Sequence, residues 1–350
     1  MTATLRVVGF GGGTGLPVLL RALSTIPEIE PTAIVTVTDN GGSSGRLRES
    51  YGIPAVGDLR NCLVALSHSD SILADLFQHR FSETDGLDGH SLGNLIVTAL
   101  CQKTGSLSRA VEMINRLLPL KGRALPTTGE QVTLCAAFTD GTTIRGESQI
   151  SQSGRCIDRI WLEPHNPRPS PGVIEAIAEA DSIIFAPGSL YTSVLPNLLV
   201  AGVADAIRGS RAVKIFVCNL MTQPGETDGY SASDHLRAIE TYLGHGVIQF
   251  CIANSLRWPA RNGSGNSHWE SVVCDSERIA AIGPVSVERD LVLAEAGGLH
   301  HDPETLGRLV WEISRGRFSQ KCYPRQSRRA IRDFSRKRGE TVCFNQAASL

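Results

Sequence analysis

Aromatic residues and long hydrophobic runs are both scarce in this sequence. Aromatic residues make up 5% of its 350 residues, which argues against an aromatic stacking platform for single-stranded nucleic acid. No window approaches the roughly 18 uninterrupted apolar residues of a transmembrane helix, so no membrane span is predicted. The N-terminus runs directly into a strand pattern and lacks the layout of a signal peptide, so we expect a cytoplasmic protein.

The cysteines also lack a pattern that would indicate a metal site or a disulfide framework. There are nine, an odd number, and they are scattered along the chain without a C-x-x-C pair or a zinc-like spacing with histidine. Several lie in apolar runs, as Cys218 does in Val213–Asn219. We therefore expect reduced, buried thiols.

The whole chain has a net charge of only -1, but two parts of it carry opposite charges that nearly cancel. The segment from Arg315 to Arg338 holds ten basic residues and one acid, Asp333, which leaves 24 basic and 34 acidic residues elsewhere. An acidic body, residues 1–314, is thus followed by a basic C-terminal extension, residues 315–350. Two interpretations of the extension remain open. It is an arm for nucleic acid, an acidic membrane surface or an acidic partner, or it is a partly helical end that docks on the acidic body.

The periodicity of the first 45 residues predicts a βαβ unit of a parallel sheet. Leu5–Phe10 has the pattern of a buried strand, Gly11–Gly15 that of a glycine loop, Val18–Ile26 that of a helix and Thr32–Thr38 that of a second strand. Further strands of the same kind are predicted at 182–185, 213–218 and 247–253. Predicted helices cover residues 58–66, 69–77, 92–101, 107–118, 172–179, 198–207, 232–243 and 301–314.

A different pattern interrupts this alternation. Residues 131–147 resemble a β-hairpin with a turn at Thr139-Asp-Gly-Thr, and Ile157–Leu162 predicts another strand. We therefore expect one α/β domain over residues 1–314, with a small β-containing extra region at about residues 120–165. Residues 259–269 are polar and predict a loop.

The first candidate site is the loop Gly9-Phe-Gly-Gly-Gly-Thr-Gly15. Glycines after a buried strand allow backbone amides to approach a phosphate at a helix N-terminus. No Gly-Lys-Ser/Thr follows, so the loop is not a P-loop, and Thr14 stands where a dinucleotide fingerprint has its third glycine. A tight strand-to-helix turn is the alternative. The candidate phosphate ligands are Gly11, Gly12, Gly13 and Thr14.

The second candidate site follows the second predicted strand. Asp39 lies where a dinucleotide-binding fold places its ribose-binding acid, and it could equally hold a divalent metal or act as a base. Behind it come the donors of a second anion-binding loop, which are Gly41, Gly42, Ser43, Ser44 and Arg46. Two such loops side by side suit a diphosphate better than a nicotinamide cofactor alone.

Four further motifs are rich in small polar residues, and each is weak alone. Gly57-Asp-Leu-Arg-Asn61 and Gly89-His-Ser-Leu-Gly-Asn94 both open predicted helices, so Asp58 and Ser91 could simply be helix caps. Because no G-x-S-x-G elbow is present, His90 and Ser91 do not indicate a hydrolase triad. Two more motifs follow predicted strands, Pro187–Ser193 with Asn197 beyond it, and Asn219–Tyr230. Together, strand ends that open into donor-rich loops predict one extended ligand cleft.

With these motifs in place, the chain resembles the YvcK/CofD-like family. This family comprises the bacterial gluconeogenesis factors, which are UDP-sugar-binding regulators, and the related 2-phospho-L-lactate transferases. The resemblance covers roughly residues 5 to 315, in family order. The matching segments are Gly11-Gly-Gly-Thr-Gly-Leu16, Ile34-Val-Thr-Val-Thr-Asp-Asn-Gly-Gly-Ser-Ser-Gly-Arg46, Gly57-Asp-Leu-Arg-Asn61, Gly89-His-Ser-Leu-Gly-Asn-Leu95, Pro187-Gly-Ser-Leu-Tyr-Thr-Ser193 and Asn219-Leu-Met-Thr-Gln-Pro-Gly-Glu-Thr227. The residues of the last segment resemble the gluconeogenesis-factor branch more closely than the transferase branch.

The resemblance implies a Rossmann-like three-layer α/β/α sandwich with a mostly parallel sheet, commonly a homodimer. The regulator branch binds UDP-N-acetylglucosamine and is linked to carbon metabolism, cell-wall precursor supply and cell shape. The transferase branch moves a phospholactyl group from a guanylyl-activated donor to a deazaflavin with the help of Mg²⁺. By this resemblance, Asp39 is the reaction or metal position. The nucleotide and phosphate ligands are then Gly11, Gly12, Gly13, Thr14, Gly41, Gly42, Ser43, Ser44, Arg46, Asn61, His90, Asn94, Gly188, Ser189, Thr192, Asn197 and Asn219.

Two departures from the family pattern bear on function. Many regulators have two acids where this chain has Asp39-Asn40, so the loss of one charge weakens the case for metal binding and catalysis. Many also have an arginine where this chain has His300, and histidine is a poorer permanent diphosphate clamp. We therefore expect a nucleotide-sugar-binding regulator first, a phospholactyl transferase second and an NAD(P)-dependent oxidoreductase third.

Overall fold

The sheet at the centre of the molecule consists of seven parallel strands. The computed structural model describes residues 4–68, 71–82, 86–257, 261–262, 268–295 and 298–316. The strand order is β12-β9-β8-β7-β1-β2-β3, and every neighbouring pair is parallel. The strands are β1 Leu5–Gly11, β2 Ile29–Val35, β3 Arg123–Pro126, β7 Ser182–Phe185, β8 Val213–Val217, β9 Phe250–Asn254 and β12 Val285–Arg289. The predicted mostly parallel sheet is confirmed.

The chain fills this sheet outward from the middle. β1, β2 and β3 occupy one half in sequence order, and β7, β8, β9 and β12 occupy the other half. The direction of growth therefore reverses between β1 and β7, which are neighbours in space. Open α/β sheets bind ligands at such a switch point, outside the carboxyl ends of the strands.

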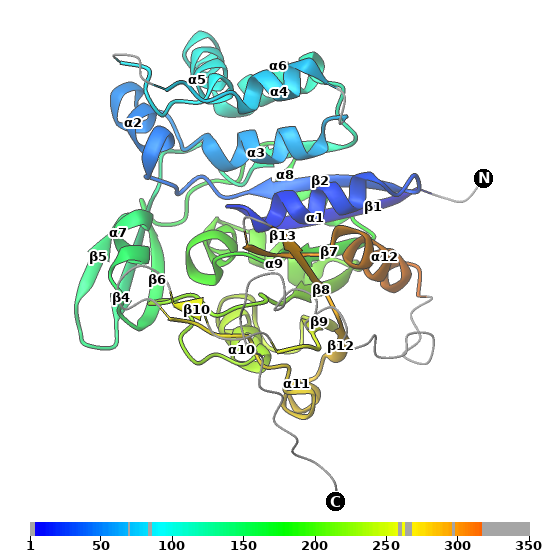
Figure 1. The fold of residues 1–350 in the computed structure, drawn as a ribbon. Coiled ribbons are helices and arrows are strands. Elements are labelled where there is room, and N and C mark those ends of the chain that lie inside the picture. Colours follow the sequence, from blue (N-terminus) through cyan, green and yellow to red (C-terminus); the bar gives the residue numbers. More distant parts are fainter. Residues whose placement is uncertain are drawn as a thin grey trace, which may run out of the picture.

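Helices flank the sheet in two groups and complete the predicted three-layer α/β/α fold (Figure 1). In one group α1 packs against α3 and α12, and in the other α9 packs against α8 and α10. Their bounds are α1 Gly15–Ser24, α3 Gly57–Leu66, α12 Pro303–Ser314, α8 Val173–Glu179, α9 Val203–Gly209 and α10 Ala232–Leu243. Leu16, Leu19 and Leu20 of α1 are completely buried, because the apolar side chains of this helix recur on the side that faces the core.

A further set of helices packs outside α3, at the top of Figure 1. It comprises α2 Gly42–Tyr51, α4 Ile72–Gln78, α5 Leu92–Thr104 and α6 Leu107–Leu117. Serines cap three of these helices, since Ser71, Ser91 and Ser106 each accept a hydrogen bond from the backbone amide three residues later. The capping role considered for Ser91 is confirmed.

The predicted hairpin and its third strand form a small antiparallel sheet beside the main one (Figure 1). Its order is β5-β4-β6, with bounds β4 Thr133–Phe138, β5 Thr143–Arg145 and β6 Ile157–Glu163. The short helix α7 (Glu147–Gln152) follows β5 and packs on β4. β3, which precedes this sheet, pairs with β2 in the main sheet.

Two predictions near the second candidate site were wrong in their boundaries. The strand predicted at Thr32–Thr38 runs from Ile29 to Val35, and the anion-binding loop predicted up to Arg46 instead enters helix α2, which starts at Gly42. This helix has little apolar periodicity, because it is mostly polar and buries Ser43, Ser44 and Arg48 together with Leu47. A pattern of apolar residues therefore could not reveal it.

The helix predicted at 198–207 is also wrong in part. The chain forms a π-helical turn, η1 (Leu190–Val194), and a 3₁₀ turn, η2 (Leu195–Leu199), before α9 starts at Val203. Gly202 has a φ of 75°, which ends the continuous helical path. Among the described residues, no single helix has the length and apolar composition needed to cross a membrane. One pair of helices, 190–199 with 203–209, meets the length and composition limits together but is bent by 82°.

The C-terminal part contains several elements that the sequence pattern did not predict. They are α11 Ser276–Ile282, the hairpin of β13 Val292–Glu295 with β14 Gly298–His301, and the strand pair β10 Arg261–Asn262 with β11 His268–Trp269. Most of the loop predicted at 259–269 lies outside the described residues, as does the basic extension from residue 317 onward. The last helix begins at Pro303 rather than at His301, because the Asp302 carboxylate accepts from the amides of Glu304 and Thr305.

Candidate functional site

Two predicted ligand loops meet at the switch point of the sheet. The glycine loop follows β1, the 187–193 loop follows β7, and the Ala186 amide donates to the Phe10 carbonyl at 2.9 Å. Gly15 lies so close to the Pro187 carbonyl that a Cβ at this position would overlap with it. The close approach of the two loops therefore requires glycine at position 15. The structure therefore brings these two candidate segments side by side at the switch point.

Asn197 is buried and links the segment after β7 to Thr127, which follows β3. It is 1% exposed, and its Nδ2 donates to the carbonyls of Ser193 and Val194 at 2.9 and 3.1 Å. Its Oδ1 accepts a hydrogen bond from the Thr127 hydroxyl. The polar atoms of Asn197 are thus used within the protein, below the loops that would face a ligand.

A group of carboxylates borders the glycine loop. A Cβ added to Gly12 would lie 2.7 Å from Asp58 Oδ2, and a Cβ added to Gly57 would lie 3.4 Å from Asp39 Oδ2. Asp58 lies in the first turn of α3, and Glu147 reaches Asp39 from α7 in the extra region and shares a hydrogen bond with it. Asp39, Asp58 and Glu147 form what we term the acidic cluster.

Within the acidic cluster, Glu147 holds its proton at neutral pH. Burial raises the pKa of Glu147 to about 8, and the charges of Asp39 and Asp58 raise it further toward that value. Burial likewise raises the pKa of Asp58 to about 6, against a lowering by the nearby Gly13 amide. Carboxyl groups whose pKa values are driven apart can serve as acid and base in one site. Only Asp39 was predicted here with a chemical role, because Glu147 belongs to no sequence motif.

Arg48 is a second functional residue that the sequence analysis missed. Its side chain is buried and donates to the Val132 carbonyl and, at 3.0 Å, to the Thr133 hydroxyl at the start of β4. Burial lowers the pKa of its guanidinium, and the negative charge of Asp39 opposes this shift. Arg48 therefore ties α2 to the extra region and offsets charge in the acidic cluster.

The acidic cluster fits a magnesium ion only in a limited way. Within the described ranges, no group of three or more His, Cys, Asp or Glu side chains is positioned to hold a metal. Asp39 Oδ1 already accepts from the Gly41 amide at 2.8 Å. Mg²⁺ commonly takes one or two protein carboxylates and completes its shell with water and phosphate oxygens. Asp39 and Asp58 could supply those carboxylates to a metal that arrives with a phosphate ligand.

The second predicted anion loop becomes the N-terminal turn of α2. Ser43 contacts His90 and Asn94, and Ser44 lies against Gly57, so this turn joins the glycine loop through α3. Arg46 donates to the Asp88 carbonyl at 2.5 Å and thus holds the loop before α5. In α3, Asn61 accepts from the Arg60 guanidinium at 2.6 Å.

The third predicted ligand loop faces the 219–230 segment instead of open space. Asn219 forms a reciprocal amide pair with Gly188, accepting its N–H at 2.7 Å and donating to its carbonyl at 2.8 Å. Gln223 Nε2 donates to the Ser189 hydroxyl at 2.7 Å. The structure therefore brings together the candidate residues Gly188, Ser189 and Asn219. The donor groups just named, however, form hydrogen bonds between the two segments.

Glu226 is the most deeply buried acid of the 219–230 segment, and the sequence analysis gave it no role of its own. Burial raises its pKa to about 7, whereas the Thr192 hydroxyl and the backbone amides of residues 190–192 lower it. These groups are near enough to act on the charge, although neither carboxylate oxygen has a partner with normal hydrogen-bond geometry. Glu226 thus presents a carboxyl group to the start of η1.

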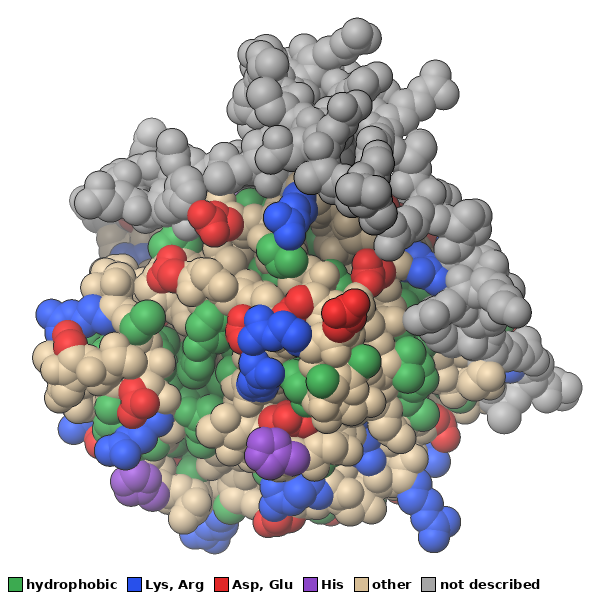
Figure 2. All heavy atoms as spheres, turned by 90° about the horizontal axis from the view of Figure 1, so that it is seen from below, with side chains coloured by type: hydrophobic (Ala, Val, Ile, Leu, Met, Phe, Trp, Pro, Cys, Tyr) green, Lys and Arg blue, Asp and Glu red, His purple; other side chains and the backbone are tan. Residues whose placement is uncertain are grey.

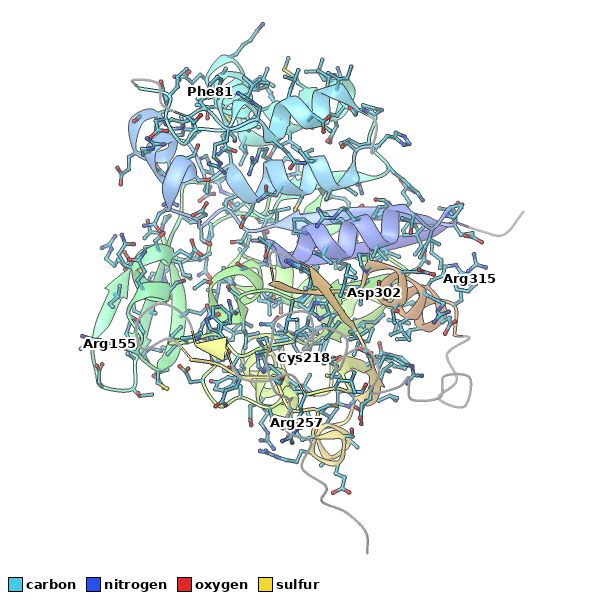
Figure 3. The ribbon with its side chains drawn as sticks, viewed as in Figure 1. Phe81, Arg155, Cys218, Arg257, Asp302 and Arg315 are labelled. Carbon is cyan, nitrogen blue, oxygen red and sulfur yellow. The ribbon has the colours of Figure 1, made fainter. Side chains whose placement is uncertain are left out.

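The hairpin of β13 and β14 contacts the chain just after β8. His301 is buried, and its Nε2 lies 3.0 Å from the Cys218 carbonyl at the end of β8. Burial lowers the pKa of His301 to about 4, so this ring is neutral. His300, the residue in place of the expected arginine, is only partly buried on the same strand. Figure 3 labels Cys218 at the end of β8 and Asp302 at the start of α12.

Side chains of both charges lie on the face of the molecule that Figure 2 shows, which is seen from below the view of Figure 1. On the face shown in Figure 2, Lys and Arg side chains are interspersed with Asp and Glu side chains among the described residues. The glycine loop adjoins the acidic cluster, since Gly12 and the Gly13 amide both lie close to the Asp58 carboxylate. Amides at a strand-to-helix turn hold an anion without a high net positive charge.

Comparisons with known proteins found a matching family model, curated relatives and similar solved structures. The family model described as 2-phospho-L-lactate transferase CofD matches residues 7–292, a range that contains every candidate site residue. A gluconeogenesis factor of Halalkalibacterium halodurans is 44% identical over 309 residues, which cover 88% of this chain and 96% of the relative. One of Bacillus subtilis is 42% identical over 310 residues, covering 88% and 98%. A crystal structure of a Bacillus halodurans protein has a TM-score of 0.83 and 43% identity, and the match covers 88% of this chain and 100% of that chain.

Proposed function

Because this chain belongs to the CofD family, we propose that it is a regulator that binds a nucleotide sugar such as UDP-N-acetylglucosamine. Its relatives at 42–44% identity bear the name gluconeogenesis factor, which supports a role linked to carbon metabolism. A link to cell-wall precursor supply and cell shape, a homodimeric state and a cytoplasmic location belong to the same proposal.

The observation that carries the proposal is the glycine loop at the switch point, where it lies beside the loop that follows β7. Gly12 and Gly13 follow β1 at the N-terminus of α1, and Gly13 has a φ of 56°, a conformation that glycine adopts without strain. This geometry suits the diphosphate of a nucleotide sugar. The acidic cluster borders this loop, so a divalent cation that bridges its carboxylates and the diphosphate would strengthen binding.

The structure of Asn40 favours binding over catalysis. Asn40 Nδ2 donates to Gln149 Oε1 at 2.8 Å, and Asn40 Oδ1 accepts from the Ser148 amide at 2.8 Å. Both polar atoms of this side chain therefore hold α7 in place. By the resemblance to the family, many regulators have an acid at position 40. Here Asn40 carries no charge, and both of its polar side-chain atoms are already hydrogen-bonded.

Calorimetric titration with UDP-N-acetylglucosamine, UDP, GDP and NAD tests the proposal directly. We expect saturable heat with UDP-N-acetylglucosamine below millimolar concentration and weaker binding of GDP and NAD. Absence of heat with either uridine nucleotide at millimolar concentration, together with binding of another nucleotide, would contradict it.

A transferase activity is the second candidate, and the acidic cluster is the observation that favours it. Asp58 and Glu147, with pKa values of about 6 and about 8, could release and accept protons near neutral pH. If the chain is a phospholactyl transferase, a deazaflavin acceptor and a guanylyl-activated phospholactate should yield GMP. Unchanged turnover in the Asp39→Asn variant would exclude the role assigned to Asp39.

A further inference from the structure

Three side chains from two separate parts of the chain form a buried polar cluster where α2 meets the start of α5. Ser43 lies in the first turn of α2, His90 directly precedes the cap of α5, and Asn94 lies in the first turn of α5. Ser43 Oγ is 2.9 Å from His90 Nδ1 and accepts from Asn94 Nδ2 at 3.0 Å. The three residues are 6%, 7% and 2% exposed. We term them the Ser43 cluster.

One acceptor of the Ser43 cluster lacks a donor. Asn94 Oδ1 is buried and has no hydrogen-bond partner among the described residues. The Nδ2 of the same amide is bound to Ser43, so the free oxygen lies beside the serine hydroxyl. Most buried side-chain oxygens are paired in folded proteins, and Asn94 Oδ1 lies beside Ser43 of the predicted anion-binding segment, so a ligand bound there could supply the missing donor.

The surroundings of the Ser43 cluster make it neutral rather than cationic. Burial lowers the pKa of His90, and the nearby charges of Arg46 and Arg80 lower it further. Both guanidiniums donate to the loop before His90, to the carbonyls of Asp88 and Gly89 at 2.5 and 2.6 Å. The arginines therefore shape this loop, and the unpaired atom of the cluster is an acceptor.

An unpaired acceptor disfavours a phosphate oxygen and favours a ligand hydroxyl or amide N–H. The Ser43 cluster is also continuous with the glycine loop. Ser44 lies against Gly57, and Asp58, the next residue, lies against Gly12. A ligand whose diphosphate lies at the glycine loop could thus extend past the acidic cluster to Ser43.

We propose that the Ser43 cluster is the sugar subsite, in which Asn94 Oδ1 accepts a hydrogen bond from a hydroxyl or acetamido N–H of the ligand's sugar. This inference rests on the proposed nucleotide-sugar function. It assigns sugar recognition to α2 and α5 and diphosphate recognition to the glycine loop. Asn94, Ser43 and His90 then determine which sugar is accepted, not whether a nucleotide binds.

Titrations of UDP and of UDP-N-acetylglucosamine into wild-type protein and the Asn94→Ala variant test the subsite. We expect the variant to bind UDP within about twofold of wild type and to bind UDP-N-acetylglucosamine about fivefold to tenfold more weakly. This is the loss expected for one or two hydrogen bonds. Ser43→Ala, which removes the partner of the Asn94 amide, should give the same pattern and serves if Asn94→Ala does not fold.

Asn115→Ala is the matched control. Asn115 is also a helical asparagine whose buried Oδ1 has no partner, but it lies on α6. The control should bind both ligands as wild type does. Equal weakening of UDP and UDP-N-acetylglucosamine in the Asn94 and Ser43 variants, or unchanged binding of both, would overturn the subsite. A wild-type protein that binds neither ligand would instead overturn the proposed function on which the subsite rests.

Discussion

Replacement of Glu226 by glutamine should change the pH dependence of stability. Burial raises the pKa of this carboxyl from 4.5 to about 7, so the folded protein binds its proton more tightly than the unfolded chain does. The stability that this proton contributes is fully present below pH 4.5. It falls away as the pH rises through about 7, and above that pH it is gone. Glutamine has nearly the same shape and does not titrate.

The size of the effect follows from the shift. A displacement from 4.5 to about 7 corresponds to about 3 kcal/mol between the two plateaus. Relative to wild type, Glu226→Gln should therefore gain about 3 kcal/mol between pH 4 and pH 8, on top of any constant difference caused by the new amide. Urea unfolding at pH 4, 5, 6, 7 and 8 measures both proteins. Parallel stability curves across this range would refute the reasoning.

Unfolding measurements on three further substitutions test a close loop contact, a helix cap and a side-chain hydrogen bond. Gly15→Ala should destabilise the protein strongly or prevent folding, because its Cβ would overlap with the Pro187 carbonyl; a melting temperature close to that of wild type would contradict this. Asp302→Ala removes the cap of α12 and should cost about 1 kcal/mol, whereas Asp302→Asn should cost clearly less. Asn40→Asp loses the hydrogen bond to Gln149 and adds charge beside the acidic cluster, so urea unfolding should show a loss of about 1 kcal/mol that is larger at pH 8 than at pH 5.

The elements predicted best were those with strong apolar periodicity. The strand at Leu5–Gly11, the helix at Ala232–Leu243 and the antiparallel hairpin all follow from local sequence patterns, and the structure confirms them. Strand order was not predicted, because it depends on which buried strands become neighbours and not on any local pattern. The switch point between β1 and β7 could therefore be found only in the fold.

The same limit explains what was missed at the site. Motifs identified Asp39 and the glycine loops, but Glu147 lies in the extra region and reaches Asp39 only because α7 packs beside it. The pairing of His90 also depends on the fold, since its partner is Ser43, 47 residues away, and not the adjacent Ser91. Helix α2 was missed because its buried face is polar, so the hydrogen bonds of Ser43 and Arg48, not apolar contacts, mark its inner side.

The central claim is that the glycine loop at the switch point holds the diphosphate of a nucleotide ligand. Calorimetric titration of UDP-N-acetylglucosamine into the Gly12→Ala and Gly209→Ala variants tests it most directly. A Cβ at Gly12 would lie 2.7 Å from Asp58 Oδ2 and from Thr36 Cγ2, whereas a Cβ at Gly209 has no atom within 4 Å. The account predicts that Gly209→Ala binds as wild type does and that folded Gly12→Ala binds at least tenfold more weakly. Equal affinity of the two variants for the ligand would contradict it.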